Sequence, residues 1–385
     1  SGSNDVSLTD ANALDLGTVG VGQNLAITAS GAITDSGVVT VAGTTSFDNS
    51  GGSDAAIDLG SSSTYTGNVS FTTDAGSDVS INDSDAFAIQ SGLNVNNLSI
   101  TAGGDVTDLG DLDIDGTLSV SAAGQAVNLD GTGNDITGGV TLTGAAVTLE
   151  DSTATAIAGI TATGALSVTS GGAITQSGAI DADSTASFAA GANAITLTNA
   201  SNDFSGAVSL SNSGSNDVSL TDANALDLGT VGVGQNLTVV AGGDITDSGV
   251  LDIAGNVLLT TNTNDGNVIF NQASDVDGLL TVTTDGTGTT SVTNLTGTID
   301  LGTITTAGLT IDARGITQTG VLTVSGTSSF SSGANAITLD QANDFSGAVS
   351  LSNSGTNNVI IDDANDLVLG TVSIATGNLN VDNAG

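Results

Sequence analysis

Residues 1–25 read SGSNDVSLTDANALDLGTVGVGQNL, and the same sequence returns unchanged at residues 213–237. Beyond this stretch, apolar residues alternate with small polar ones over four to six positions, as in Val250-Leu251-Asp252-Ile253. Gly, Asn, Asp or Ser separates each run from the next. Alternation with a period of two is typical of a β-strand with one buried face. The sequence therefore predicts short strands that are joined by tight turns.

A short motif gives the period of the repeat. Its central apolar residue recurs in steps of 73, 68, 71 and 71, at Ile33, Val106, Ile174, Ile245 and Ile316. A second motif, Asn-Asp-apolar-x-Gly, gives steps of 71, 68, 72 and 69 for the apolar residues Tyr65, Ile136, Phe204, Val276 and Phe345. We infer one continuous repeat solenoid over residues 1–385, in units of roughly 71 residues that start near Leu25, Leu98, Leu166, Leu237 and Leu309.

The predicted fold is all-β: a single-stranded parallel β-helix, or β-solenoid, with about three coils in each unit of roughly 71 residues. In one unit the coils begin near Leu166, Ala186 and Val208, and the next unit starts at Leu237, so the steps are 20, 22 and 29. Right-handed coiling is expected from strand twist and crossover rules. Since neighbouring coils lie about 4.8 Å apart, the chain would form a rod of about 80 Å.

One position of the repeat is apolar but varies in shape, which indicates a site in the core rather than at a ligand. It is occupied by Phe47, Val120, Phe188, Leu259 and Phe330. The absence of Pro from the sequence fits the same fold, because Pro would remove hydrogen bonds from central strands.

The formal net charge is −40, from 41 acidic residues and a single base, Arg314. Nucleic acid is excluded as a partner because no basic patch can neutralise phosphates, and anionic membrane surfaces are disfavoured for the same reason. No apolar run reaches the length of about 18 residues that a transmembrane helix needs, so none is expected. The sequence shows no signal peptide and no initiator Met, which we interpret as a mature product or an excised piece.

The residue types argue against an enzyme. His, Cys and Lys are absent, so Ser and Thr have no base partner of the usual kind, and we assign no catalytic, cofactor-binding or metal-binding residue. Arg314 replaces a Gly of the repeat, seen at Gly172 and Gly243, and is interpreted as a surface substitution. A polysaccharide-degrading β-helix enzyme, which would use an acidic cluster in a groove, stays a minor alternative.

Three acids alternate in the run DLDIDG, so a strand would carry Asp111, Asp113 and Asp115 on one face. Carboxylates grouped in this way suit Ca²⁺. The equivalent segment near Val250 keeps only Asp252, and the one near Val321 has no acid, so the group is not a property of the repeat. We expect a solvated acidic face, with weak Ca²⁺ binding as the alternative. Threonine runs such as TTNT and TITT suggest an ice-binding solenoid as a further minor alternative.

Phrases such as NLTVVAGGDITDSG, ANDFSGAVSLSNSG and ANALDLGTV resemble the repeat regions of large bacterial surface adhesins of the filamentous haemagglutinin type, which use two-partner secretion. The resemblance covers the whole chain in repeat texture and composition. It implies a right-handed parallel β-helix, secretion to the cell surface of a Gram-negative bacterium, and a role as an adhesin shaft or extracellular fibre.

The function expected is therefore a structural extracellular shaft or fibre segment of a bacterial surface adhesin. Neither end of the sequence reads as a cap, which predicts that copies associate end to end into filaments. The alternative is an adhesive surface that binds carbohydrate or cations. The partners expected are other copies of the chain and cell-surface glycans, without nucleic acid or membrane insertion.

Overall fold

The computed structural model describes residues 2, 4–52, 54–90, 92–263, 265–293 and 295–383. All regular secondary structure in these ranges is β-strand, and no helix that could span a membrane is found there. The strands pair in parallel and form a β-solenoid of about 19 turns, so the predicted fold class is confirmed. The predicted right-handed sense stays a prediction.

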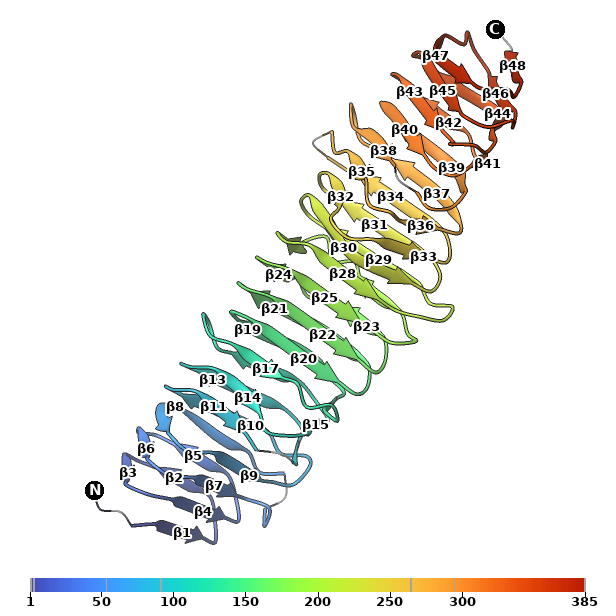
Figure 1. Ribbon diagram of the computed structural model, residues 1–385. Helices are drawn as coiled ribbons and strands as arrows, with labels where there is room; N and C mark the ends of the chain where they lie inside the picture. Colours follow the sequence, from blue (N-terminus) through green and yellow to red (C-terminus); the bar gives the residue numbers. More distant parts are fainter. Residues whose placement is uncertain are drawn as a thin grey trace. The chain divides into compact units, whose positions relative to one another are not determined.

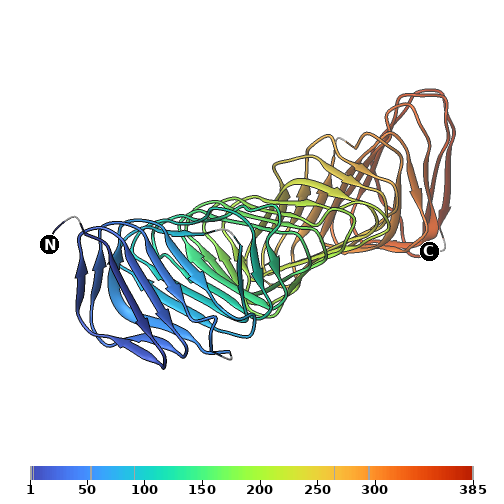
Figure 2. The same ribbon diagram turned by 90° about the horizontal axis from the view of Figure 1, so that it is seen from below.

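The chain divides into two compact units, Ser1–Ser187 and Phe188–Gly385, and the division falls within one strand. Within each unit the coils lie one on the next in chain order (Figure 1). Figure 2 shows the same stacking from below, with the strands of successive coils running side by side. Whether the chain is one continuous solenoid concerns the joining of the two units and stays a prediction.

Two kinds of segment alternate along the chain, and each makes half of a coil. A short segment is a single strand of four to six residues. A long segment consists of two very short strands or of one longer strand, and it spans eight to ten residues except at β47, which has six. Because turn residues and glycines interrupt the long segments, their strands are shorter or shift in register.

In the first unit the short segments are β1 (Val6–Asp10), β4 (Leu25–Ala29), β7 (Thr45–Asp48), β9 (Val69–Thr72), β10 (Val79–Asp83), β13 (Leu98–Ala102), β16 (Leu118–Ser121), β19 (Gly139–Gly144), β20 (Val147–Asp151), β22 (Leu166–Ser170) and β25 (Ala186–Ala189), which contains the division. The long segments are β2 and β3 (Leu14–Leu16, Val19–Val21), β5 and β6 (Ile33–Asp35, Val39–Val41), β8 (Ile57–Tyr65), β11 and β12 (Phe87–Ile89, Leu93–Val95), β14 and β15 (Val106–Asp108, Leu112–Ile114), β17 and β18 (Val127–Leu129, Asp135–Ile136), β21 (Thr155–Ala162), and β23 and β24 (Ile174–Gln176, Ile180–Ala182).

In the second unit the short segments are β28 (Val208–Ser211), β29 (Val218–Asp222), β31 (Leu237–Ala241), β34 (Val257–Thr261), β37 (Leu279–Thr283), β38 (Thr289–Val292), β40 (Gly308–Asp312), β43 (Ser328–Ser331), β45 (Val349–Asn353), β46 (Val359–Asp363) and β48 (Leu379–Asn383). The long segments are β26 and β27 (Ile195–Leu197, Asp203–Phe204), β30 (Leu226–Val233), β32 and β33 (Ile245–Asp247, Leu251–Ile253), β35 and β36 (Val268–Phe270, Asp275–Val276), β39 (Ile299–Thr306), β41 and β42 (Ile316–Gln318, Leu322–Val324), β44 (Ile337–Phe345) and β47 (Leu369–Ile374).

The order of segments shows that one repeat contains seven half-coils. Four short segments alternate with three long ones, and two short segments then follow each other where the next repeat begins, as β9 and β10 do. The register gives the same count, because seven parallel pairings lead from β4 through β7, β9, β11, β14, β17 and β20 to β22, two repeats further on. Each repeat is therefore three and a half coils.

An odd number of half-coils places equivalent residues on alternating sheets. Leu25 lies on β4 and Leu166 on β22, which belong to the same sheet. Leu98, which holds the equivalent place in the repeat between them, lies on β13 in the other sheet. In the second unit Leu237 on β31 and Leu309 on β40 likewise lie on different sheets.

The predicted division into coils is wrong in its last step, the one from Val208 to Leu237. Val208 pairs with Leu228, and Leu237 pairs instead with Val218 on the other sheet. The apparent third coil therefore contains three half-coils, β28, β29 and β30, which is one and a half coils. Apolar and polar residues alternate in the same way on both sheets. The alternation therefore could not show whether Leu237 lies on the sheet of Val208 or on the opposite one.

The core consists of inward side chains stacked coil upon coil. The predicted core position is confirmed, because its residues are all at most 1% exposed: Phe47, Val120, Phe188, Leu259 and Phe330. Its rings pack edge-on against an aromatic of the following long segment, for example Phe188 against Phe204 at 6.1 Å and Phe330 against Phe345 at 6.0 Å between centroids. Such T-shaped pairs are a favoured arrangement of aromatic rings.

Candidate functional site

The stacking of half-coils changes at two kinds of place, which we call joins. At an Asn–Asp join, the first short segment of a repeat stacks on the last long segment of the repeat before it, as β46 stacks on β44. At a bulge join, the last short segment of a repeat lies under the first long segment of the next, as β28 lies under β30. Register shifts occur at both, because segments of different length cannot match residue for residue.

Each Asn–Asp join contains a buried amide or hydroxyl that links neighbouring coils. Asn343 is fully buried, and its Oδ1 accepts a hydrogen bond from the Leu322 amide in the coil before, at 3.0 Å. Its Nδ2 donates to the carbonyl of Asp362 in the coil after, at 3.0 Å. Asn134 makes the same contacts in the first unit, with the Leu112 amide and the Glu150 carbonyl. These side chains satisfy main-chain groups that the change of segment leaves without a strand partner.

A buried aspartate completes the join. The Asp363 carboxylate accepts a hydrogen bond from the Phe345 amide at 3.2 Å, and Asp83, Asp151 and Asp222 do the same for Tyr65, Ile136 and Phe204. All four aspartates are at most 3% exposed. Their carboxylates stand where a strand carbonyl would otherwise accept the amide proton.

Burial changes the acidity of these carboxyls. Loss of hydration raises the pKa of Asp222 to about 6, although the amides of Phe204 and Asn224 donate to the carboxylate and oppose the change. Burial also raises the pKa of Asp83 and Asp151. The other oxygen of Asp222, Oδ2, is buried without a hydrogen-bond partner, so desolvation outweighs the two amide bonds. The sequence motif Asn-Asp-apolar-x-Gly marked these joins, but its role in linking coils was missed.

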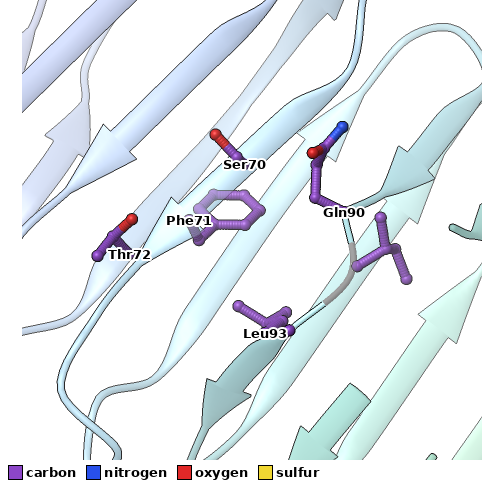
Figure 3. A pocket seen from close by; sticks show the side chains of 7 residues that line it. Ser70, Phe71, Thr72, Gln90 and Leu93 are labelled. Carbon is purple, nitrogen blue, oxygen red and sulfur yellow. The ribbon is translucent and has the colours of Figure 1, made fainter. Parts of the chain in front are cut away.

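One bulge join differs from its four counterparts. Where β9 meets β11, the described residues pair at a single position, Val69 with Ile89. In the other four joins the pairing resumes after the shift. A hollow of about 230 Å³ opens beside β9, lined by Ser70, Phe71, Thr72, Ile89, Gln90, Gly92 and Leu93 (Figure 3).

The three acids predicted to share a face do so. Asp111, Asp113 and Asp115 are all exposed beside β15, while Leu112 and Ile114 between them are buried. They are held separately, since Asp113 accepts a hydrogen bond from Asn94 at 2.6 Å and Asp111 from the Gly133 amide at 2.9 Å. No group of three possible metal ligands lies together in the described residues. Weak Ca²⁺ binding stays a prediction.

Arg314, expected at a surface turn, is exposed beside Asp312 at the edge of a shallow hollow. That hollow is formed by the ends of three stacked segments, after β38, β40 and β43, with Leu295, Ala313 and Ser332 among its residues. Since Gly172 and Gly243 hold the equivalent place in other repeats, the guanidinium belongs to one repeat and not to the repeating surface.

Hydroxyl groups form the regular feature of the outer surface. On β10, β13, β16 and β19 the outward residues Ser80, Ser99, Ser119 and Thr141 are in register, one above the other. A second row beside them holds Asn82, Thr101, Ser121 and Thr143. The first row ends at β19, because Thr141 pairs with Gly159 of β21 at the bulge join, whereas the second row continues from Thr143 to Thr161.

A family model describes the repeat found in the chain. It is the model of repeats of unknown function (DUF5649), and it matches residues 3–73, 76–143, 144–211, 215–283, 287–352 and 356–385. The chain belongs to this repeat family. The first five matched ranges each contain seven half-coils, so the boundaries of the DUF5649 repeat fall at the joins. The comparisons with curated proteins and with solved structures found no match.

The unit starts predicted from the sequence, Leu25, Leu98, Leu166, Leu237 and Leu309, each lie on the second short segment of a DUF5649 repeat. They have the right period but begin one coil after the matched boundaries. The family match supports a repeat protein, and the resemblance to filamentous haemagglutinins belongs with the proposals below.

Proposed function

We propose that the protein is a structural, extracellular scaffold, a shaft or fibre segment of a bacterial surface adhesin. The observation that carries the proposal is the uniform build of the repeat. Each coil bonds to the next through its main chain, and buried Asn and Asp side chains restore these bonds at the joins. Such a molecule gains length with each copy without a change in its cross-section, which suits a spacer.

The surface supports the same proposal. A net charge of −40 favours solubility and repels copies from one another side by side. Rows of Ser and Thr hydroxyls cover the short segments and need no further partner than water. The resemblance in repeat texture to haemagglutinin-type adhesins agrees with secretion to the surface of a Gram-negative bacterium, which is part of the proposal.

Shortening the gene tests the proposal. In the bacterium that makes the protein, deletion of residues 76–211 removes two whole repeats and retains the order of joins. For a spacer, surface display should be unchanged and attachment of cells to a surface should weaken in part. Complete loss of attachment with normal display would identify a site in the deleted part instead. Finding the full protein in the cytoplasm of intact cells would contradict the proposal.

Association of copies end to end is the partner interaction proposed together with this function. Electron microscopy of the purified chain tests it separately. Filaments with a length that grows with concentration would support association. Molecules that stay dispersed at high concentration would contradict it, without affecting the proposal of a spacer.

A further inference from the structure

Three aspartates at the Asn–Asp joins are buried without a counter-charge. Asp83, Asp151 and Asp222 are each at most 2% exposed. Lys and His are absent from the sequence, which contains a single base, Arg314. Where a charged neighbour acts on one of these carboxyls, it is another acid. A buried carboxylate without a base is costly while it is charged, so the three sites favour the neutral form.

The hydrogen bonds at these joins leave one carboxylate oxygen free to take a proton. Oδ1 of Asp222 accepts the main-chain amides of Phe204 and Asn224, both at 3.4 Å. Its Oδ2 is buried and has no partner among the described residues. Asp83 has the same arrangement at the first join. A proton on Oδ2 therefore removes the buried charge and leaves the bonds of Oδ1 to the next coil in place.

Asp151 reaches the same result through a threonine. Its Oδ1 accepts the Ile136 amide at 3.4 Å and the Thr153 amide at 3.0 Å, while its Oδ2 accepts the Thr155 hydroxyl at 3.1 Å. A hydroxyl can accept a hydrogen bond as well as donate one, so Thr155 can rotate to receive the proton of a neutral carboxyl. Protonation again needs no change in the main chain.

Acids of the preceding coils add to the effect of burial. Asp203 on β27 repels the charge of Asp222 and raises the pKa of that carboxyl further. Asp135 on β18 accepts a hydrogen bond from the same threonine hydroxyl as Asp151. Asp108 lies on the other side of the asparagine of that join. Each of these neighbours disfavours a negative charge on the buried carboxyl.

Asp83 is faced by one acid and one phenol. The charge of Asp85 raises the pKa of Asp83, and burial raises the pKa of the Tyr65 phenol, which therefore stays neutral. Asp35 adds a further negative charge beside that ring. The residues that pair with the three aspartates from the following coil are uncharged: Ala102, Ser170 and Ala241. Among these neighbours no base opposes protonation.

The strand ladder stops just before these aspartates, which makes their carboxylates the last links of the join. Pairing between β17 and β20 ends at Leu149, and pairing between β26 and β29 ends at Leu220. The carboxylate two residues further on then supplies the acceptor for the coil before it. Loss of this one bond frees the end of a segment without breaking the rest of the ladder. Joins are therefore places where the solenoid can open locally.

We propose that the joins at Asp83, Asp151 and Asp222 act as pH switches, which hold neighbouring coils together in mildly acidic surroundings and open locally at neutral pH. The inference goes beyond the role of a spacer and does not depend on where the protein is located. It assigns to the buried acids a regulatory role in the stiffness of the chain.

The direction of the switch follows from the protons bound. Burial raises the pKa of Asp222 to about 6 and also raises the pKa of Asp83 and Asp151. A carboxyl with a raised pKa in the folded state stabilises that state fully below its unfolded pKa of about 4. This contribution is lost as pH rises through the folded pKa, which for Asp222 is about 6.

Hydrogen exchange of the full chain, followed by NMR, tests the switch. The amides observed are those of Tyr65, Ile136 and Phe204, which donate to the three carboxylates. Their exchange rates are divided by the intrinsic rates at each pH to give protection factors. Between pH 7.5 and pH 5 we expect the protection of Phe204 to rise about tenfold, as a pKa of about 6 requires. Unchanged protection of all three amides would overturn the proposal.

Two variants separate a local switch from a general effect of charge. Asp222→Asn should abolish most of the rise at Phe204 and leave that at Tyr65, and Asp83→Asn should do the reverse. The exposed control Asp277→Asn removes one charge and should alter neither. A rise at Phe204 that persists in Asp222→Asn would contradict the proposal, as would equal changes at both amides. Surface display is measured separately, so failure here leaves the spacer proposal intact.

Discussion

The Asp222 carboxylate accepts a hydrogen bond from the main-chain amide of Phe204 at 3.4 Å, although the two residues are 18 positions apart and lie on successive coils. The carboxylate replaces a main-chain carbonyl as the acceptor for this amide, because the chain turns at the end of β29 and no longer runs beside the strand before it. The same carboxylate is 2% exposed, and one of its oxygens has no partner. The join is thus held together by a charged group in a poorly hydrated place, which is costly at neutral pH.

Asp222→Asn should stabilise the protein at pH 7. The folded state raises the pKa of Asp222 to about 6, above the usual value of 3.8, so the folded chain binds more protons than the unfolded one between these values. The stabilisation from the protonated carboxyl is complete below about pH 4 and is lost as pH rises through about 6. Replacement by the neutral amide should therefore add about 1–3 kcal/mol at pH 7 and little at pH 4, measured by urea unfolding.

The exposed residue Asp277 provides a control for the change in net charge, because Asp277→Asn removes a charge without altering a buried group. Equal gains from the two variants would show that the effect comes from overall repulsion. The chain itself contains a neutral version at this position of the repeat, since Asn294 occupies it in the sequence, although Asn294 lies outside the described residues.

Asn343→Ala should destabilise the chain by about 2–4 kcal/mol, because the Leu322 amide and the Asp362 carbonyl would be buried without partners. Asn343→Ser should cost less. The hydroxyl of Ser274, at the equivalent place, accepts a hydrogen bond from the Leu251 amide at 3.0 Å, and that of Ser63 does so for Val39. Chemical unfolding of both variants gives the comparison. If Asn343→Ala cost less than about 1 kcal/mol, the amide would have no bridging role.

The half-coil arrangement can be tested by cross-linking. Ser219 and Thr238 are outward register partners on β29 and β31, and neighbouring parallel strands lie about 4.8 Å apart, which suits a disulfide. A Ser219→Cys/Thr238→Cys variant should therefore close a disulfide on mild oxidation. Ser209→Cys/Thr238→Cys should not, although it would if Leu237 stacked on Val208. The chain has no cysteine of its own, so the result on a non-reducing gel is direct.

Phe330→Ala should cost about 3–5 kcal/mol, because the ring is fully buried and packs edge-on against Phe345. Phe330→Leu should cost much less, since Leu259 fills the equivalent place and is also fully buried. Thermal unfolding monitored by far-ultraviolet circular dichroism would compare the two. A similar loss for both would mean that ring contacts, and not filled volume, determine stability at this position.

The fold class followed from the sequence because alternation and turn residues describe a strand wherever it lies. The inward position shared by Phe47, Phe188 and Phe330 followed for the same reason. The number of half-coils did not follow. A short segment reads as apolar-polar-apolar on either sheet, so Leu237 gave no sign that it lies on the sheet opposite Val208.

The candidate site was harder to predict. Aspartates were interpreted as turn residues and solvated charge, and this holds for Asp111, Asp113 and Asp115 but not for Asp222. The difference depends on which segment stacks on which, and one sequence does not give that information. The sequence pattern did not single out Phe71, whose side chain is partly exposed while the other described aromatic side chains are buried.

Because each repeat has an odd number of half-coils, seven, the orientation of the repeat alternates from one copy to the next. Within the first unit, odd and even copies present the same residues to opposite flanks, and two copies, with a rise of about 34 Å, make the true geometric period. Gain or loss of one copy by recombination would invert the flank shown by every later copy in a continuous stack, whereas a change of two would leave it as before. Variation in copy number thus alters orientation as well as length.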